Sequence, residues 1–126
     1  MRQLRTRARA TPLGDADVVV PGGTMQILDV AFAVEKCRSE YGVLGLSVYA
    51  GAGLGVEELC MTAAIPHSRI RTATVEDLRR AVDISLLPTF HAPHYTLGLP
   101  DGESATIRAV CDAFGSPMPN PATSRR

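Results

Sequence analysis

The sequence has no tryptophan, and aromatic residues make up only 5% of it. Aliphatic side chains such as Val, Leu, Ile and Ala must therefore fill most of the core. No apolar run reaches the roughly 20 residues that a helix needs to cross a bilayer. The N-terminus is basic, but no apolar segment of signal-peptide type follows it directly. We therefore expect a cytoplasmic protein without a membrane partner.

Cysteine is also scarce. The three cysteines, Cys37, Cys60 and Cys111, are widely spaced, and no two of them form a C-x-x-C pair. Each lies in an apolar, helix-like context, which favours buried free thiols over disulfides. A core can form without such links, since 45% of the 126 residues are hydrophobic and 21% are charged.

The formal net charge is zero, but the charges are segregated. Arg2, Arg5, Arg7 and Arg9 fall in the first ten residues, and two more arginines end the chain. Residues 11–124 therefore hold seven basic residues against 13 acidic ones. Basic ends of this kind can bind an anionic partner such as RNA, or lie on the acidic body itself. The twelve arginines against one lysine indicate a GC-rich bacterial genome.

The hydrophobic pattern predicts an α+β fold, with a small mixed sheet of about four to five strands, including a C-terminal hairpin, packed with three to four helices. We expect one domain over residues 15–115, a disordered basic segment over 1–14 and a disordered Pro-rich tail over 116–126. The expected strands are 15–20, 43–51, 68–74, 84–90 and 94–99, and the expected helices are 24–42, 56–63, 75–83 and 101–114.

Several local signals support these boundaries. Gly42 fits the position just after a helix, where a left-handed residue is favoured. Thr74 and Asp77 resemble a capping box at the start of the helix over 75–83. Pro88 interrupts its strand and therefore indicates a sheet edge or a bulge.

The most specific candidate site is His94-Tyr95-Thr96, which follows a turn. Because side chains alternate along a strand, His94 and Thr96 should lie on the same face. An imidazole and a hydroxyl in one cleft can bind a phosphate, and histidine can move a proton near neutral pH. The alternative is a structural strand, in which Tyr95 and Leu97 pack on the core while His94 and Thr96 face solvent.

Two resemblances start from these residues. The run PHYTL, residues 93–97, resembles one copy of the His-x-Thr motif of the two-histidine phosphoesterases, the RNA ligase-like family. That family pairs two such motifs, one histidine acting as base and the other as acid, and His67-Ser68-Arg69 is the second candidate here. The run HYTLGLP with the helix after it also resembles the end of small bacterial toxin domains, including a type VI secretion effector family.

The turn before His94 has a second interpretation. His91 and His94 could chelate a metal ion if a third ligand such as Cys111, Asp112 or His67 lay nearby. A plain polar turn is the simpler interpretation. We therefore expect no metal and no cofactor.

Two further patterns carry weaker chemistry. The glycine loop at 51–55 stands between a strand and a helix and could hold a phosphate, but its spacing is not that of a dinucleotide-binding loop. Ser47 has no G-x-S-x-G context. We expect it to be a buried, hydrogen-bonded hydroxyl in the second strand.

Four arginines form the only basic cluster in the body of the chain: Arg69, Arg71, Arg79 and Arg80. With Tyr49 or Tyr95 nearby they could bind RNA or a nucleotide, arginine on the phosphate and tyrosine stacked on a base. The alternative is ordinary ion pairing with nearby acidic residues, namely Glu76, Asp77 and Asp83.

Two functional hypotheses follow. In the first, the protein is a small bacterial toxin-like enzyme, a phosphoesterase or transferase that acts on RNA or a nucleotide phosphate. His94 is the acid–base group, Thr96 a phosphate contact and Arg71 part of a charge clamp; Arg69, Tyr95, His91 and His67 contact the substrate. In the second, the protein is a non-catalytic domain that binds a cognate protein in a two-protein bacterial pair, through its hairpin edge and basic N-terminal arm.

Overall fold

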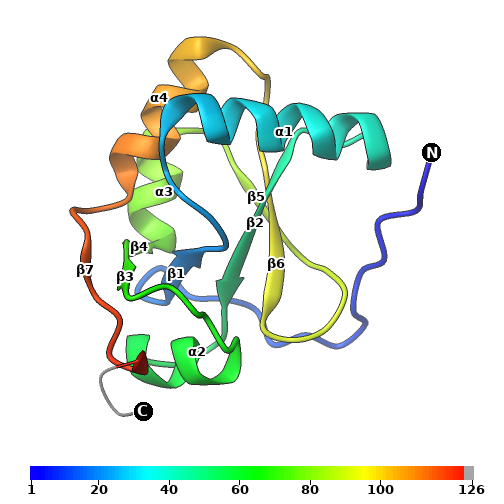
Figure 1. The fold of residues 1–126 in the computed structure, drawn as a ribbon. Coiled ribbons are helices and arrows are strands. Elements are labelled where there is room, and N and C mark those ends of the chain that lie inside the picture. Colours follow the sequence, from blue (N-terminus) through cyan, green and yellow to red (C-terminus); the bar gives the residue numbers. More distant parts are fainter. Residues whose placement is uncertain (124–126) are drawn as a thin grey trace.

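The fold is built on one five-stranded sheet with the strand order β4-β1-β2-β6-β5, in which every neighbouring pair is antiparallel. The structure is a computed structural model, and it describes residues 1–123. A second sheet of two short antiparallel strands, β3 and β7, lies beside it (Figure 1). The α+β class is confirmed, and the sheet expected to be mixed is antiparallel throughout.

The elements follow the predicted order. The strands are β1 (Val18–Pro21), β2 (Gly45–Ala50), β3 (Arg69–Ile70), β4 (Ala73–Thr74), β5 (Ser85–Pro88), β6 (His94–Gly98) and β7 (Met118–Pro119). The helices are α1 (Ile27–Tyr41), α2 (Val56–Thr62), α3 (Val75–Ala81) and α4 (Ser104–Ala113). Among the described residues, no helix combines the length and the apolarity that a membrane span needs.

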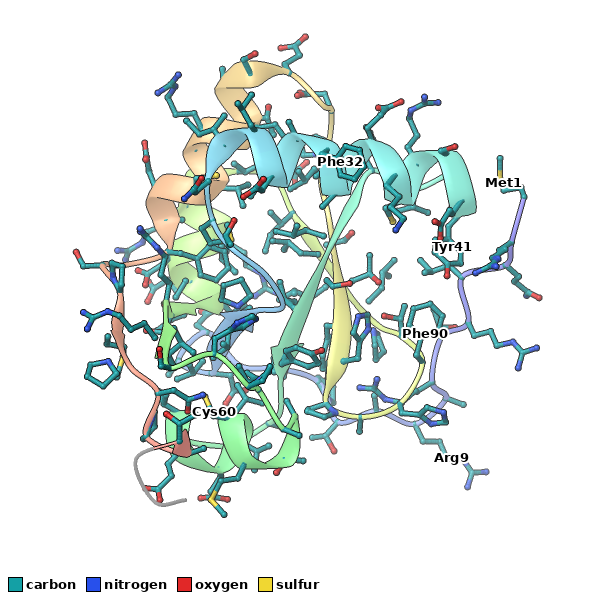
Figure 2. The ribbon with its side chains drawn as sticks, in the orientation of Figure 1. Met1, Arg9, Phe32, Tyr41, Cys60 and Phe90 are labelled. Carbon is teal, nitrogen blue, oxygen red and sulfur yellow. The ribbon has the colours of Figure 1, made fainter. Side chains whose placement is uncertain are left out.

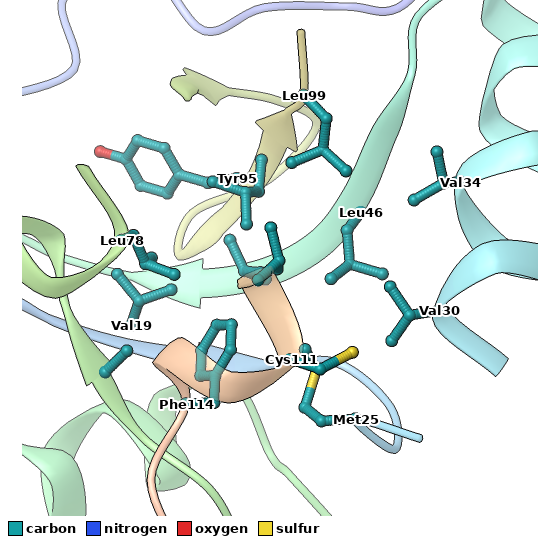
Figure 3. Packing of buried hydrophobic residues seen from close by; sticks show 14 of the residues in the cluster. Val19, Met25, Val30, Val34, Leu46, Leu78, Tyr95, Leu99, Cys111 and Phe114 are labelled. Atoms are coloured by element: carbon teal, nitrogen blue, oxygen red, sulfur yellow. The ribbon is translucent and has the colours of Figure 1, made fainter. Parts of the chain in front are cut away.

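The two faces of the sheet are covered differently. Alternation along β2 sends Leu46, Val48 and Ala50 to one face, where the side chains of α1, α3 and α4 complete the main core (Figure 3). A smaller cluster on the opposite face packs α2 against β1 and includes Val20 and Leu59. Among residues 1–123, neither cluster extends over the rest of that second face, around Ser47, where Cys37 of α1 lies close to Gly45.

Three predictions that depend only on a residue and its neighbours in the sequence are confirmed. Gly42 ends α1 with φ +74° and donates its N–H to the carbonyl of Arg38. Thr74 and Asp77 form the capping box of α3. Pro88 ends β5, which is an edge strand of the sheet, where its missing N–H leaves no ladder partner unpaired.

The predicted strand over 68–74 is divided. β3 pairs with β7 in the small sheet, whereas β4 pairs with β1 in the large one. Arg71 and Thr72 lie between the two strands. An alternating sequence pattern gives no sign of such a change of partner, because both halves remain extended.

The N-terminal segment 1–14, expected to be disordered, instead lies against the body. Thr6 forms a bridge with Thr89, and backbone hydrogen bonds join Arg7 N–H to the Pro88 carbonyl at 2.7 Å and Phe90 N–H to the Arg5 carbonyl at 3.0 Å. The segment buries little apolar surface, so a search for a hydrophobic period does not detect it. It is held by backbone groups that the end of edge strand β5 leaves unpaired.

The tail also has a defined path, which corrects the expectation of disorder over 116–123; residues 124–126 lie outside the described residues. β7 pairs with β3, and the side chain of Asn120 is fully buried. Its Nδ2 donates to the carbonyls of Ile65 and His67 at 3.1 and 2.9 Å, and its Oδ1 accepts from the Ala122 N–H at 2.9 Å. One amide thus fastens the tail in the absence of an apolar pattern.

Replacing this amide should measurably destabilise the fold. Asn120→Ala leaves two carbonyls and one N–H without their partner, and we expect a loss of about 1–3 kcal/mol in the free energy of unfolding. Urea denaturation followed by circular dichroism measures it. Ser116→Ala, on an exposed residue of the same tail, should change the free energy by less than about 0.5 kcal/mol. Equal stabilities of the two variants would show that the Asn120 amide contributes nothing.

Candidate functional site

A chain of four polar side chains crosses the open part of the second sheet face. His94 Nε2 lies 3.1 Å from Ser47 Oγ, and His94 Nδ1 lies 2.9 Å from Thr89 Oγ1. Thr89 Oγ1 in turn lies 2.8 Å from Thr96 Oγ1. When Nδ1 donates to Thr89, Nε2 is left as the acceptor for the Ser47 hydroxyl. This is the arrangement of a nucleophile, its base and a group that orients the base.

The strand register produces this arrangement. β2 and β6 are antiparallel, with Ser47 opposite Thr96 and Tyr49 opposite His94. Positions of the same parity face the same side, so Ser47, Thr96 and His94 share one face. Thr89 follows the last residue of β5, and its N–H donates to the His94 carbonyl at 3.3 Å.

Arg7, from the N-terminal segment, holds the loop that carries this chain. Its Nη1 donates to the carbonyls of Thr89 and His94 at 2.8 and 2.6 Å, and its guanidinium lies 5.1 Å from the ring centre of Tyr95. Two aromatic rings flank the imidazole: the ring centre of Phe90 lies 5.3 Å away and that of Tyr49 lies 5.8 Å away. The ring of His94 is therefore enclosed on several sides.

This environment keeps His94 neutral. Partial burial lowers the pKa of His94, the backbone contact with Thr89 opposes that shift, and the positive charge of Arg7 adds to the lowering. A neutral imidazole can accept a proton, so the site is poised for a general base at neutral pH.

A titration checks this environment. We expect the ring protons of His94 to titrate by NMR with a midpoint below the ordinary value of about 6.5, so that His94 gains its proton only in more acidic solution. Arg7→Gln keeps N–H donors for the two carbonyls but removes the charge, and should raise the midpoint. Arg9→Gln, on an exposed neighbour, should leave it unchanged. A midpoint at or above the ordinary value would contradict the arrangement.

Ser47 and Thr96 open into a cavity of about 510 Å³, called here the Ser47 hollow. Gly22 and Gly23 from the β1–α1 loop form one wall, and Phe90 closes another. The side of α1 that carries charged and polar residues completes the lining with Asp29, Lys36, Cys37, Glu40 and Tyr41. His94 reaches the hollow through its contact with Ser47. In Figure 2, Tyr41 and Phe90 are seen on the side where the N-terminal segment passes.

Two glycines lie where the backbone closes around the serine, and a side chain there would be crowded. A Cβ at Gly22 would lie 3.2 Å from the Ser47 carbonyl oxygen, and a Cβ at Gly45 would lie 2.6 Å from Thr96 Cγ2. The Gly22 N–H donates to the Ser47 carbonyl at 3.0 Å. Cys37 also lines the hollow, but burial raises the pKa of its thiol and so disfavours a thiolate nucleophile.

The structure separates the other predicted site residues from this group. Arg69, Arg71 and His67 line a second cavity and do not reach the Ser47 hollow, so Arg71 cannot stabilise charge that develops beside His94. The expected clamp required one continuous strand, which the change of partner between β3 and β4 prevents. Tyr95 is buried in the main core, on the face opposite His94.

His91 contributes its backbone rather than its ring. The carbonyl of His91 accepts from the His94 N–H at 2.9 Å, which closes the turn, and its side chain is exposed. In the part of the chain that the structure describes, no three His, Cys, Asp or Glu side chains gather where they could hold a metal ion. The glycine loop at 51–55 lines neither the Ser47 hollow nor the second cavity.

Ser47 was expected to be buried, and the structure shows it exposed. The apolar residues of β2 alternate strictly around it, with Leu46 and Val48 buried on the core face. That alternation was the signal that could have placed Ser47 on the open face. No sequence pattern connects Thr89 or Arg7 to His94, because each joins through a contact that the turn and the N-terminal segment create.

Comparisons of the chain with protein-family models, with curated proteins and with solved structures found no match.

Proposed function

We propose that the protein is a small phosphoesterase or phosphotransferase that acts on RNA or a nucleotide phosphate, with Ser47 as nucleophile and His94 as its acid–base group. The observation that carries this proposal is the 3.1 Å contact between His94 Nε2 and Ser47 Oγ, together with the open cavity that Ser47 lines. The proposal keeps the acid–base role that the sequence suggested for His94, and it adds Ser47 as the hydroxyl from which His94 takes a proton. A toxin-like role in a bacterial cell agrees with this chemistry.

The reaction has two balanced steps. Ser47 Oγ attacks phosphorus while its proton passes to His94 Nε2; the bond from phosphorus to the leaving alcohol breaks, and the alcohol takes that proton. Water, or an acceptor alcohol, then attacks the phosphoserine; its proton passes to His94, and Ser47 leaves with the proton returned. Both steps begin from the neutral imidazole, which partial burial favours.

The third group is a hydroxyl, and this affects the expected rate. Thr89 can orient the imidazole through Nδ1, but it brings no negative charge to stabilise the imidazolium that forms. Lys36 on the wall of the hollow is already paired with Glu40 at 4.0 Å, and Asp29 lines the same cavity, so a phosphate would have to compete for this cation. We therefore expect slow turnover, with proton transfer efficient only above the pKa of His94.

Covalent labelling tests the nucleophile. A fluorophosphonate should add one phosphonyl group to Ser47, detected by intact mass and peptide mapping, because the same Oγ attacks phosphorus in the probe. Ser47→Ala should abolish the label, and Ser116→Ala should keep it. Cleavage of single-stranded RNA and of nucleotide phosphoesters is measured on the same samples. Labelling without phosphoester cleavage, but with hydrolysis of carboxyl esters, would overturn the substrate class; no labelling would overturn the nucleophile.

A second candidate function is supported by one surface observation. Leu28 and Phe32 lie one turn apart on α1 and are 84% and 72% exposed (Figure 2 shows Phe32 on the outer side of the helix). Apolar side chains left exposed on one helix face suit a cognate protein partner. Under this alternative, Phe32→Asp abolishes complex formation with the product of the neighbouring reading frame, and Ser47 shows no labelling.

A further inference from the structure

A second cavity, called here the arginine hollow, lies on the other side of the β1–α1 loop from the Ser47 hollow. It measures about 430 Å³. Its polar lining comes from two segments, the stretch that contains β3 and the loop that leads into α1: His67, Ser68, Arg69, Arg71, Thr24 and Gln26. Among the described residues, no acidic side chain lines it. The cavity therefore offers two guanidinium groups, the Ser68 hydroxyl and the Gln26 amide to a ligand, while the Thr24 hydroxyl donates to Asp29.

Carbonyls are the only hydrogen-bond acceptors that the guanidinium groups of this cavity have in the described part of the chain. Arg69 Nη2 lies 3.3 Å from the Pro117 carbonyl, and Arg71 Nη1 lies 3.2 Å from the Gly115 carbonyl. Within residues 1–123, neither arginine forms an ion pair with a carboxylate. These bonds anchor one edge of each guanidinium through neutral carbonyl acceptors.

The other two arginines of the predicted basic cluster behave differently. Arg79 Nη1 pairs with Asp15 at 3.0 Å, and Arg80 Nη2 pairs with Glu76 at 2.6 Å. Ion pairing with Glu76, Asp77 and Asp83 was the alternative for the whole cluster, and of these expected partners only Glu76 forms a pair, with Arg80, while Arg79 pairs with Asp15 instead. Arginine can bind a phosphate through two parallel N–H···O bonds, so Arg69 and Arg71 are the residues free to do so.

The two hollows are neighbours. Pro21, Gly23, Thr24 and Met25 line both of them, so a single loop forms the wall between the two cavities. Figure 1 shows β3 and β7 side by side. The acidic Asp29 lies on the Ser47 side of this wall, where the Thr24 hydroxyl donates to it at 2.6 Å. A chain-like ligand that enters one hollow can cross this loop and reach the other.

We propose that the arginine hollow binds a second phosphate of the substrate, next along the RNA chain from the phosphate that reacts at Ser47. This inference rests on the proposed function, which gives RNA or a nucleotide phosphate as the substrate. It restricts that substrate to one with at least two phosphates. Arg69 and Arg71 are then binding residues that select for chain length. They take no part in stabilising the transition state, from which the loop wall separates them.

Binding to an RNA that the protein cannot cleave tests this inference. In a Ser47→Ala background, a labelled single-stranded RNA hexamer is titrated at several salt concentrations. Arg69→Gln with Arg71→Gln keeps N–H donors for the two tail carbonyls and removes both charges. We expect affinity to fall at least tenfold, and the slope of log K against log salt to decrease by about 0.7, the value for one phosphate contact on a single strand.

A matched control uses the paired arginines. Arg79→Gln with Arg80→Gln removes the same charge from α3, and should weaken binding less than twofold. Inorganic phosphate alone should shift the backbone amide resonances of Gln26 and Ser68 more than that of residue 47 in the same background. Equal losses in the two double variants, or no phosphate shift at Gln26 and Ser68, would overturn the inference.

The RNA-binding test and the Ser47 labelling test can fail independently of each other. Arginine-dependent RNA binding by a protein whose Ser47 is never labelled would remove the catalytic proposal and leave a phosphate-binding hollow. RNA cleavage that depends on Ser47 but not on Arg69 and Arg71 would do the reverse. Circular dichroism of each variant checks that the domain stays folded when Arg69 and Arg71 no longer hold the tail carbonyls.

Discussion

His94→Ala should lower the rate of phosphonylation at Ser47, and of RNA cleavage, by about 10²–10⁴-fold, the range for loss of a positioned general base. The Ser47 hydroxyl would keep its place on β2 but lose the acceptor that lies 3.1 Å away. The thermal midpoint should change little, because His94 is only partly buried and Thr89 keeps its contact with Thr96. Single-turnover labelling followed by mass spectrometry measures the rate directly.

The other two histidines serve as controls. His91→Ala keeps the backbone carbonyl that closes the turn, and His67→Ala changes only the second cavity, so both should label at the wild-type rate. The double variant Ser47→Ala/His94→Ala should be no slower in RNA cleavage than Ser47→Ala alone, since residues that act as a unit are not additive. A His94→Ala protein that labels normally but melts many degrees lower would identify His94 as structural.

The pH profile of the labelling rate adds a second check on the same residue. Because partial burial lowers the pKa of His94, the rate should stay near its plateau through neutral pH and fall only as acidic solution protonates the ring. Arg7→Gln removes a positive neighbour and should move the fall towards higher pH. If Arg7→Gln left the pH profile unchanged, the charge of Arg7 would have no influence on His94 during the reaction.

The fold could be predicted from the sequence where a local rule decides it. Gly42, Thr74 with Asp77, and Pro88 each act through their own backbone or their nearest neighbours, and each was located correctly. The predicted helices and most predicted strands correspond to those observed, because a helix or strand needs an apolar face that repeats along the chain.

The remaining features depend on contacts between segments that are far apart in the sequence. The first 14 residues and the tail have no apolar period, and they are held by Arg7 and Asn120 through hydrogen bonds to distant carbonyls. The change of sheet between β3 and β4 decides that Arg69 and Arg71 face a different cavity from His94. A sequence pattern records which residues are extended, but not which strand they join.

Part of the candidate site could be predicted from the sequence, and the part that depends on strand pairing could not. His94 and Thr96 follow from strand alternation alone, and they lie on one face as expected. Ser47 required knowledge that β2 pairs with β6 and that neither core cluster of the described residues extends over this part of the sheet. The serine therefore became a candidate nucleophile only when the register was known.

Leu97→Ala should lower the free energy of unfolding by about 2–5 kcal/mol, the largest stability effect expected of any substitution considered. Leu97 is fully buried on the core face of β6, between β2 and β5, and truncation leaves a cavity there. Small domains have only about 5–15 kcal/mol of total stability, so a substantial part of it is removed. Urea denaturation measures this loss. An m-value equal to that of the wild type would show that the substitution changes stability and not the compactness of the unfolded state.

The opposite face of the sheet supplies the control, and the pair of results bears on function. Ser47→Ala removes an exposed hydroxyl, and should change stability by less than about 0.5 kcal/mol while abolishing the covalent label. If Ser47→Ala destabilised the protein as much as Leu97→Ala, the hydroxyl chain from Ser47 to Thr96 would be a structural network. Leu97 lies on the face that packs the main core, and Ser47 lies on the opposite face. Measuring stability and labelling for both variants separates a structural role of Ser47 from a catalytic one.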